Sequence, residues 1–434
     1  MKITSFRIAV MTLCALLAFV PAGASDFTLG IFGNANMDDT IDELDIEYVQ
    51  GIINGINEPT QFADANYDGV IDENDIEQIK LVISSEEKKL TLIDDSGKIV
   101  TVTKPVEKII PIYMADSVRV LGANDMVVGV EESINNQPEY YPVLSQKPSV
   151  GTVSPEINIE RIIRLDPDLV IASVYTSPDI LDDHLKGTNI QVVRIYPRNE
   201  DALGDVKTGL HMFRGNEIMW PSLVEDMLKL GYVLNKVDTA KEYVEWYYSI
   251  VTPIEERISH IQEDERPKIY TEDDSRGGTI ERQTSAHIMG TLTAGGNRIG
   301  PGTFDLAADR IISVEWLIAQ NPDVIVARIG SGSSTGGYKS SENTDYREYY
   351  NEIMGLPGIK QINAVKNNRV HIICDHISYR TALPIGIAYQ AKWYYPELFA
   401  DLDPQALHQE YIDRFCSELE FDVHEDGVFV YPPL

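Results

Sequence analysis

The sequence predicts an α/β protein of two lobes with parallel sheets, joined by a long backbone helix and preceded by a small all-α module with two oxygen-rich loops. Three observations predict this. From Leu90 onward, short β-branched segments alternate with amphipathic helical patterns, which is typical of layered α/β folds. One segment repeats without a gap 155 residues further along the chain. Ahead of both copies lie two loops in which oxygen-bearing side chains recur at fixed spacing.

The first 24 residues have the pattern of a signal peptide. Lys2 and Arg7 precede the apolar run Ile8–Val20, and Ala22-Gly23-Ala24 supplies small residues for cleavage. The apolar run is about 13 residues long, whereas a helix needs about 20 to cross a bilayer. We therefore expect an exported protein, periplasmic or at the cell surface, with no membrane span.

Composition limits the partners and the redox chemistry. The formal net charge of -32 argues against nucleic acid or an anionic membrane as partner, because both require a basic face. After cleavage only Cys374 and Cys416 remain, so a disulfide framework is excluded. A single disulfide bond and two buried thiols both stay open.

Residues 25–89 are predicted to form a calcium-binding module. From Asp26 to Lys89 there are 16 acidic and 3 basic residues, a net charge of -13. Oxygen-bearing side chains occupy positions 1, 3, 5, 9 and 12 of two loops that start 30 residues apart, and this is the spacing of calcium loops. The predicted ligands are Asn34, Asn36, Asp38, Asp42 and Asp45 in the first loop and Asp64, Asn66, Asp68, Asp72 and Asp75 in the second. The alternative is an acidic linker whose spacing is accidental.

An apolar helical pattern follows each loop, and position 12 carries aspartate where a paired EF-hand has glutamate. This arrangement resembles a dockerin over about residues 30–85. The resemblance implies bound calcium and a possible cohesin-like partner. The first loop departs from the pattern, because Asn34 stands in place of an aspartate and Asp39 in place of the glycine found in the second loop, Gly69.

The repeat defines the two lobes, which we place at residues 90–215 and 266–434. Residues 157–173 align with residues 312–328, and in each copy a helix cap, a short helix and a proline precede an apolar strand. Between the copies, residues 216–265 are predicted to connect the lobes. Apolar residues at helical spacing from Asp238 to Glu263 predict one long helix, which Pro253 should kink or divide.

The chain from about residue 90 to residue 415 resembles the substrate-binding proteins of ABC importers for ferric siderophores and cobalamin. An ordered series of motifs carries the resemblance: Leu121-Gly122 to Gly129-Val, Asn158-Ile-Glu160, Ala294-Gly-Gly-Asn297, Ser313-Val-Glu315 and Tyr395-Pro-Glu-Leu-Phe399. An extra segment at about residues 203–221 departs from the family. The resemblance implies a non-catalytic protein that holds a small molecule between its lobes and delivers it to an ABC permease.

Two glutamates match the family's permease-docking positions. Glu160 and Glu315 occupy equivalent places in the two copies of the repeat, and in the family one such glutamate per lobe pairs with arginines of the permease. The alternative is that each glutamate only stabilises the first turn of its helix, typically by about 0.3 to 1 kcal/mol.

Ligands of α/β sheets bind beyond the carboxyl ends of the strands, and the loops there contain aromatic and basic residues. Candidate ligand-binding residues are Tyr113, Tyr140, Tyr141, Tyr175, Arg198, Arg276, Arg328, His376 and Arg380. Arginines suit an anionic iron complex such as a ferric siderophore, and tyrosine faces would equally suit a corrinoid or haem. For each of these residues alone, an internal ion pair or a surface ring is an alternative.

Other functions remain open from the sequence. Cleft histidines and carboxylates could hold a bare metal ion. A dockerin-like module could also belong to a polysaccharide-active enzyme, although no serine-hydrolase elbow or zinc-protease motif is present. A third possibility is a scavenging protein that binds its ligand but feeds no permease.

Overall fold

The computed structural model describes residues 27–112, 114–152, 157–173, 176, 178–195, 221–273, 282–283, 290–299, 311–330, 334–378 and 380–434. The predicted signal peptide and most of the segment 203–221 lie outside these residues, as do Tyr113, Tyr175, Arg198 and Arg276. Within the described residues, no helix is both long and apolar enough to cross a membrane.

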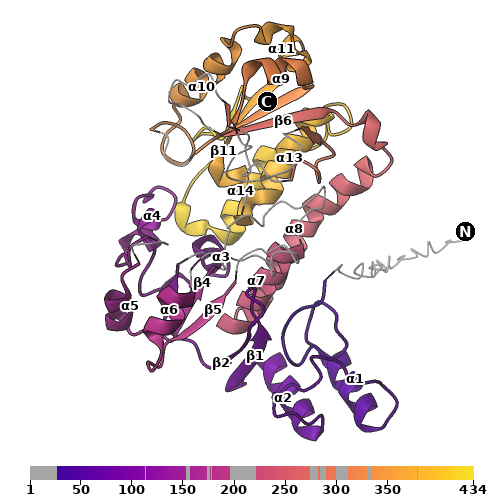
Figure 1. Ribbon diagram of the computed structural model, residues 1–434, viewed down its shortest axis with the longest axis vertical. Helices are drawn as coiled ribbons and strands as arrows, with labels where there is room; N and C mark the ends of the chain where they lie inside the picture. The colour runs from indigo at the N-terminus through magenta and orange to yellow at the C-terminus, as the bar shows by residue number, and fades with distance from the viewer. Residues whose placement is uncertain are drawn as a thin grey trace, which may run out of the picture.

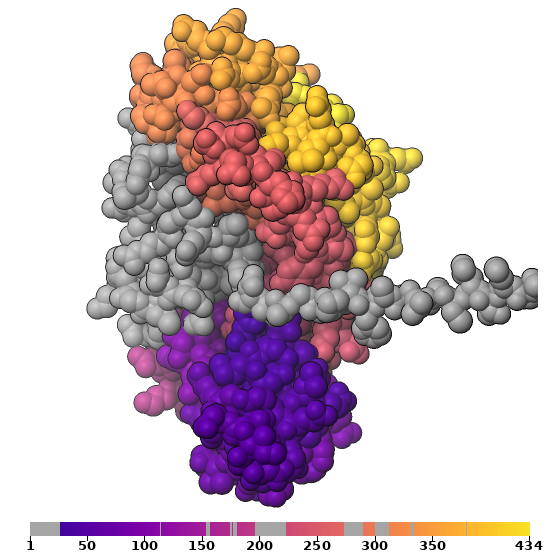
Figure 2. Space-filling view, turned by 90° about the vertical axis from the view of Figure 1, so that its right-hand side faces the viewer, coloured from indigo at the N-terminus to yellow at the C-terminus, as the bar shows by residue number. Residues whose placement is uncertain are grey.

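The N-terminal module holds two helices, α1 (Glu43–Ile53) and α2 (Glu73–Ser84), each preceded by one of the oxygen-rich loops. Both helices begin with a capping box, because Asp42 and Asp72 cap the first turn and the third residue of each helix accepts the cap's N–H. In Figure 1 the module lies at the end of the molecule away from the C-terminal lobe, and Figure 2 shows it packed directly against the body.

The module is joined to a β-hairpin, β1 (Lys89–Ile93) and β2 (Ile99–Thr103), which opens the next part of the chain. The N–H of Phe32 donates to the carbonyl of Thr91 over 2.9 Å, and the N–H of Ile93 donates to the carbonyl of Gly30 over 2.8 Å. These bonds satisfy the free edge of β1, which would otherwise expose unpaired backbone groups. The module therefore shares backbone hydrogen bonds with the next part of the chain.

The N-terminal lobe is built on a parallel sheet with the strand order β3-β4-β5. Its strands are β3 (Ile109–Pro111), β4 (Leu169–Ala172) and β5 (Gln191–Arg194). Its helices are α3 (Ala115–Val120), α4 (Glu132–Asn135), α5 (Ile159–Leu165) and α6 (Pro178–Leu185). β4 is buried along its whole length, as expected for a central strand of a parallel sheet.

The C-terminal lobe is built on a larger sheet with the order β12-β11-β10-β6-β8, parallel except for β12. Its strands are β6 (Lys268–Asp273), β8 (Asn297–Ile299), β10 (Val324–Ile329), β11 (Val370–Cys374) and β12 (Val430–Tyr431), and a separate pair is β7 (Arg282–Gln283) with β9 (Ile311–Ile312). Its helices are α9 (Val314–Gln320), α10 (Thr344–Met354), α11 (Asn363–Lys366), α12 (Asp375–Ser378), α13 (Leu383–Tyr394) and α14 (Pro404–Phe415).

The two copies of the sequence repeat fold alike. Asn158 and Ser313 each cap a seven-residue helix, α5 or α9, through a bond from the N–H three residues on. Each helix ends at a residue in the left-handed region, and the chain then enters β4 or β10. Asp168 and Asp323 accept hydrogen bonds from the backbone at the start of the neighbouring strand region. The gapless alignment therefore predicted a real structural repeat.

Two helices connect the lobes, α7 (Pro221–Leu234) and α8 (Val237–Ile258). Figure 1 shows α8 running from the N-terminal lobe to the C-terminal lobe. Of the two predicted effects of Pro253, a kink or a division, the division does not occur, because α8 continues through the proline to Ile258. Proline removes the hydrogen bond to the carbonyl of Ser249, but Ser249 and Pro253 are exposed, so water can satisfy that carbonyl.

Candidate functional site

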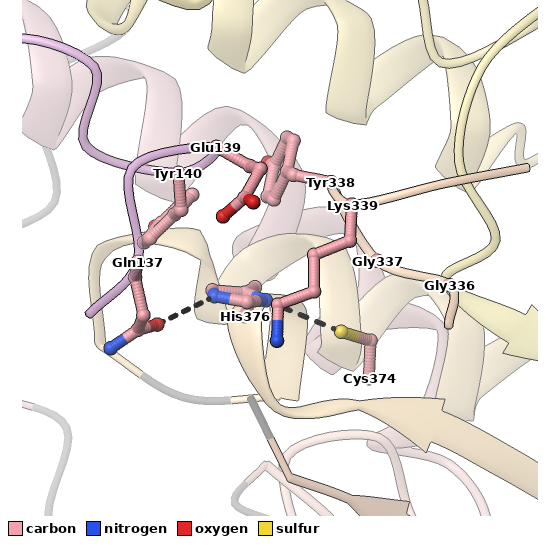
Figure 3. Close-up of a pocket in the computed structure, with 9 residues that line it drawn as sticks. All are labelled: Gln137, Glu139, Tyr140, Gly336, Gly337, Tyr338, Lys339, Cys374 and His376. Carbon is pink, nitrogen blue, oxygen red and sulfur yellow. Dashed lines mark hydrogen bonds between the residues drawn. The ribbon is translucent and has the colours of Figure 1, made fainter. Parts of the chain in front are cut away.

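The two lobes meet where loops of the N-terminal lobe face the carboxyl ends of β10 and β11. Gln137, Glu139 and Tyr140 follow α4, and they face Tyr338, Lys339, Cys374 and His376 of the C-terminal lobe (Figure 3). The space between these side chains is about 10 Å³, close to the smallest volume that holds one water molecule. The lobes are thus in direct contact at this point.

An ion pair crosses from one lobe to the other beside this contact. Arg380 Nη1 lies 2.9 Å from Asp116 Oδ2, and the other oxygen of Asp116 accepts a 2.8 Å hydrogen bond from the hydroxyl of Tyr141. Asp116 is in α3 and Arg380 begins a short turn before α13. Burial alone would raise the pKa of Asp116, but the guanidinium groups of Arg380 and Arg119 hold it below its usual value.

Aromatic rings form the centre of the contact. Tyr140 stacks on Tyr338 with ring centroids 4.9 Å apart, and its ring also lies 4.2 Å from that of His376. The guanidinium of Arg119 lies over the ring of Tyr140, 4.1 Å from the ring centre. Tyr140 is only 5% exposed, because residues of both lobes enclose it.

A histidine and a cysteine of the C-terminal lobe line the same contact. His376 Nε2 lies 3.1 Å from Gln137 Oε1 of the other lobe, and its Nδ1 lies 3.5 Å from Cys374 Sγ (Figure 3). Burial lowers the pKa of His376 to about 4 and raises the pKa of Cys374 to about 11. Both groups are therefore neutral at pH 7, so His376 donates its Nε2 proton to Gln137.

The remaining candidate arginine of the described residues is already paired. Arg328, at the end of β10, forms an ion pair with Asp375, the first residue of α12. Arg328 and Arg380 therefore both bind carboxylates of the protein itself, which is the alternative that the sequence left open. Cys374 and Cys416 are free, buried thiols.

A comparison with protein families decides the class of this chain. Residues 114–375, more than half of the chain, match the family model described as periplasmic binding protein. The chain belongs to this family. It is thus a solute-binding component of an ABC transporter, and the contact described above lies between the two lobes of a binding protein.

Curated relatives and solved structures agree with this assignment. The chain is 21% identical over 305 residues to the molybdate-binding protein MolA of Haemophilus influenzae, covering 68% of this chain and 81% of the relative. It is 25% identical over 326 residues to the uncharacterized ABC transporter substrate-binding lipoprotein YvrC of Bacillus subtilis, covering 72% of this chain and 87% of the relative. The TroA-like periplasmic binding protein FepB of Veillonella parvula superposes with a TM-score of 0.59 at 23% identity, covering 78% and 98%.

The predicted docking glutamates of this binding protein are both exposed. Glu160 lies in the first turn of α5 and Glu315 in the first turn of α9, the equivalent helix of the other lobe. Each side chain sits two residues after its helix cap. The two carboxylates are therefore presented to solvent by matching elements.

The two oxygen-rich loops of the module share the hydrogen bonds made by the residue at position 12. In both, the residue at position 12, Asp45 or Asp75, is fully buried and accepts hydrogen bonds from the N–H groups of positions 3 and 9. Burial raises the pKa of Asp45 to about 7 and also raises the pKa of Asp75. Among the described residues, no three His, Cys, Asp or Glu side chains are grouped closely enough to hold a metal ion.

The structure brings together five of the nine residues predicted to bind ligand: Tyr140, Tyr141, Arg328, His376 and Arg380. The other four lie outside the described residues. Sequence reasoning missed Asp116, Gln137, Tyr338 and Cys374. Cys374 could have been found, because it ends a predicted strand at the sheet edge where ligands bind. The others lie in loops or in a short helix that no spacing rule assigns to the crevice.

Proposed function

We propose that this chain is the extracytoplasmic receptor of an ABC importer and takes an anionic iron complex, such as a ferric siderophore, between its lobes. The observation that carries the proposal is the ion pair between Arg380 and Asp116. A guanidinium already holding a carboxylate at the crevice can bind a carboxylate or catecholate oxygen of a ligand instead. The relative MolA is a molybdate-binding protein, and molybdate is an anion.

A corrinoid or another flat macrocycle is the second candidate, and the tyrosine pair favours it. Tyr140 and Tyr338 come from different lobes and stack on each other. Opening the crevice would separate the two rings, and a flat ring system could then lie between them. A bare metal ion has less support, since Cys374 and His376 are the only soft donors of the crevice contact drawn in Figure 3.

Docking to the permease is proposed to use Glu160 and Glu315. Both are exposed, and the two lobes hold them on equivalent helices joined through α8. Exposed carboxylates at a fixed separation suit a pair of arginines on a partner, because charges at an interface rim set orientation and association rate. A scavenging protein that feeds no permease would not need them.

We further propose that the N-terminal module binds calcium and presents a surface to a cohesin-like protein. Tyr67 and Gly69 adopt positive φ angles of 59° and 92°, which curl the second loop around its centre, and its side chains offer four carboxylates and one amide oxygen. Binding an ion would draw Asp64, Asp68 and Asp75 closer together. More than half of the large apolar side chains exposed in the described residues belong to the module, which favours a protein partner.

Ligand titration tests the proposed receptor function. The mature protein, followed by its tryptophan fluorescence, is titrated with ferric siderophores, cobalamin, haem and molybdate. We expect saturable binding of one anionic complex and weaker binding to Arg380→Gln. Turnover of soluble glycans without binding of any of these compounds would instead favour the polysaccharide enzyme, which the family match already disfavours.

A further inference from the structure

The two loops of the module have the same spacing but different hydrogen bonds. In the second loop, Asp64 at position 1 accepts bonds from the N–H groups of Asp68 and Gly69, and its side chain donates nothing. In the first loop, the amide nitrogen of Asn34 donates to the carbonyls of Leu29 and Asp38 over 2.8 and 2.6 Å. Two carbonyl oxygens so close to one side-chain atom require a donor there, which fixes the orientation of the Asn34 amide.

The other ligand positions of the first loop are bonded to one another. The amide nitrogen of Asn36 donates to Asp38 Oδ2 over 2.6 Å, and the N–H of Thr40 donates to Asp38 Oδ1 over 2.9 Å. Asp68, the residue of the second loop that matches Asp38, accepts only the N–H of Val70 on Oδ1, and nothing within the described part of the chain donates to its Oδ2. At position 5, both carboxylate oxygens thus accept hydrogen bonds within the first loop, whereas one of them is left for a cation in the second loop.

The first loop is also less accessible to solvent than the second. The segment before the first loop folds over it, since Leu29 N–H donates to Asp38 O over 2.8 Å and Thr28 Oγ1 donates to Met37 O over 2.9 Å. Asn34 is fully buried. In the second loop Asp68, Gly69 and Val70 are all exposed.

The body of the protein also holds the first loop. The hydroxyl of Tyr232, in α7, accepts the N–H of Ile41 over 2.9 Å and lies 3.4 Å from the carbonyl of the same residue. Tyr232 is 4% exposed, so this contact is buried. Ile71, the matching residue of the second loop, is partly exposed.

From these differences we infer that only the second loop binds calcium, whereas the first loop is a metal-free joint that Asn34 closes and Tyr232 fastens to α7. This inference rests on the proposed calcium role of the module. In a calcium loop the cation holds the loop together by binding several oxygens. In the first loop the amide of Asn34 does this instead, because its two N–H donors bind two carbonyl oxygens. The first loop therefore keeps its shape without metal and fixes the module to α7.

The test compares matched substitutions at position 5 of each loop in the full mature chain. Calcium is titrated calorimetrically into chelator-treated protein. We expect one calcium ion per chain, unchanged stoichiometry and affinity in Asp38→Asn, and binding weakened roughly tenfold or more in Asp68→Asn, because calcium affinity follows the number of charged ligands. Two ions per chain, or weaker binding in Asp38→Asn, would overturn the inference.

Hydrogen exchange separates this inference from the calcium proposal on which it rests. In EDTA we expect slow exchange for the amides of residues 36–45, and faster exchange there in Tyr232→Phe, whereas the amides of residues 66–75 should slow only when calcium is added. If the wild type binds no calcium but residues 36–45 stay protected in EDTA, the calcium proposal fails and the metal-free joint stands. Fast exchange of residues 36–45 in EDTA would refute the joint itself.

Discussion

Arg380 of the C-terminal lobe and Asp116 of the N-terminal lobe form a 2.9 Å ion pair, although 264 residues separate them in the sequence. The Asp116 side chain is 4% exposed and that of Arg380 is 35% exposed. Arg380 has a φ of 60°, which non-glycine residues rarely adopt and which often marks a functional site. The pair therefore joins the two lobes directly.

Replacing Arg380 tests whether this pair holds the lobes together. Arg380→Gln should lower the free energy of unfolding by about 1 to 2 kcal/mol, because a buried carboxylate loses a charged partner but keeps Arg119 and Tyr141. The two lobes should also separate more readily, which small-angle scattering would record as a larger radius of gyration. Arg257→Gln is the matched control, since Arg257 pairs with the exposed Asp401 away from the crevice. Equal scattering and stability in both variants would contradict the role of the pair.

Charge reversal at the two exposed glutamates should separate transport from binding. In cells that depend on this importer, Glu160→Lys with Glu315→Lys should reduce uptake by about tenfold or more, because rim charges control encounter and orientation with a partner. The dissociation constant of the purified variant for the ligand should stay within about twofold of the wild type, since neither residue lies at the lobe contact. Unchanged uptake would reject the docking role and support a scavenging protein.

A buried lysine fastens the module to the end of α7. Lys104 Nζ lies 3.1 Å from Glu87 Oε1 and donates to the carbonyls of Tyr232 and Val233 over 2.5 and 2.9 Å. Burial lowers the pKa of Lys104, while Glu87 opposes that shift. Lys104→Met should lower the free energy of unfolding by about 3 to 5 kcal/mol, because it leaves the Glu87 carboxylate buried without its cation. Urea unfolding measures this change.

Two further variants check why Lys104→Met should lower the free energy of unfolding. Adding Glu87→Leu to Lys104→Met should recover about half of that loss, since the unpaired charge is then gone. Lys98→Met should cost no more than about 1 kcal/mol, because Lys98 forms a half-exposed pair with Asp182. If Lys98→Met and Lys104→Met cost the same, burial of the Lys104 pair is not what stabilises the junction.

His408 should make stability fall in weak acid. It is 1% exposed, its Nε2 lies 2.7 Å from the hydroxyl of Tyr338, and burial lowers its pKa from 6.5 to about 3. In the unfolded chain His408 is protonated below about pH 6.5, whereas in the folded chain it stays neutral down to about pH 3. From pH 7 to pH 5 this group should remove about 2 kcal/mol of stability.

His408→Gln isolates this contribution, because glutamine does not titrate. The stability of the wild type relative to the variant, measured by urea unfolding at several pH values, should fall by about 2 kcal/mol between pH 7 and pH 5. A difference that stays constant with pH would show that the pKa of His408 is the same in the folded and unfolded chains, which would contradict this prediction.

Local patterns in the sequence predicted the repeated units well. The caps Asn158 and Ser313, the short helices after them and the buried strands that follow depend on neighbouring residues, so their order in the chain is sufficient to identify them. The two helices that follow the loops of the module were predicted for the same reason. The sequence could not tell whether Pro253 divides its helix, because that depends on whether the freed carbonyl is exposed, which is a property of the packed helix.

The contacts that position the crevice could not be predicted in this way. The pairs of Arg380 with Asp116 and of Tyr140 with Tyr338 join residues from different lobes, and no periodicity connects them. Asn34 was recognised as a departure from a calcium loop, but its two hydrogen bonds depend on how residues 28 and 29 fold back over the loop. Tyr232 carried no signal, because its partner Ile41 is 191 residues away.

The most direct test of the binding-protein function is equilibrium dialysis of the mature protein against ferric siderophores, cobalamin, haem and molybdate, with bound material identified by mass spectrometry. We predict that one compound is retained at one molecule per chain and is recovered chemically unchanged. Retention of none of them, together with conversion of an offered substrate, would contradict the claim that two lobes hold a small solute for an importer.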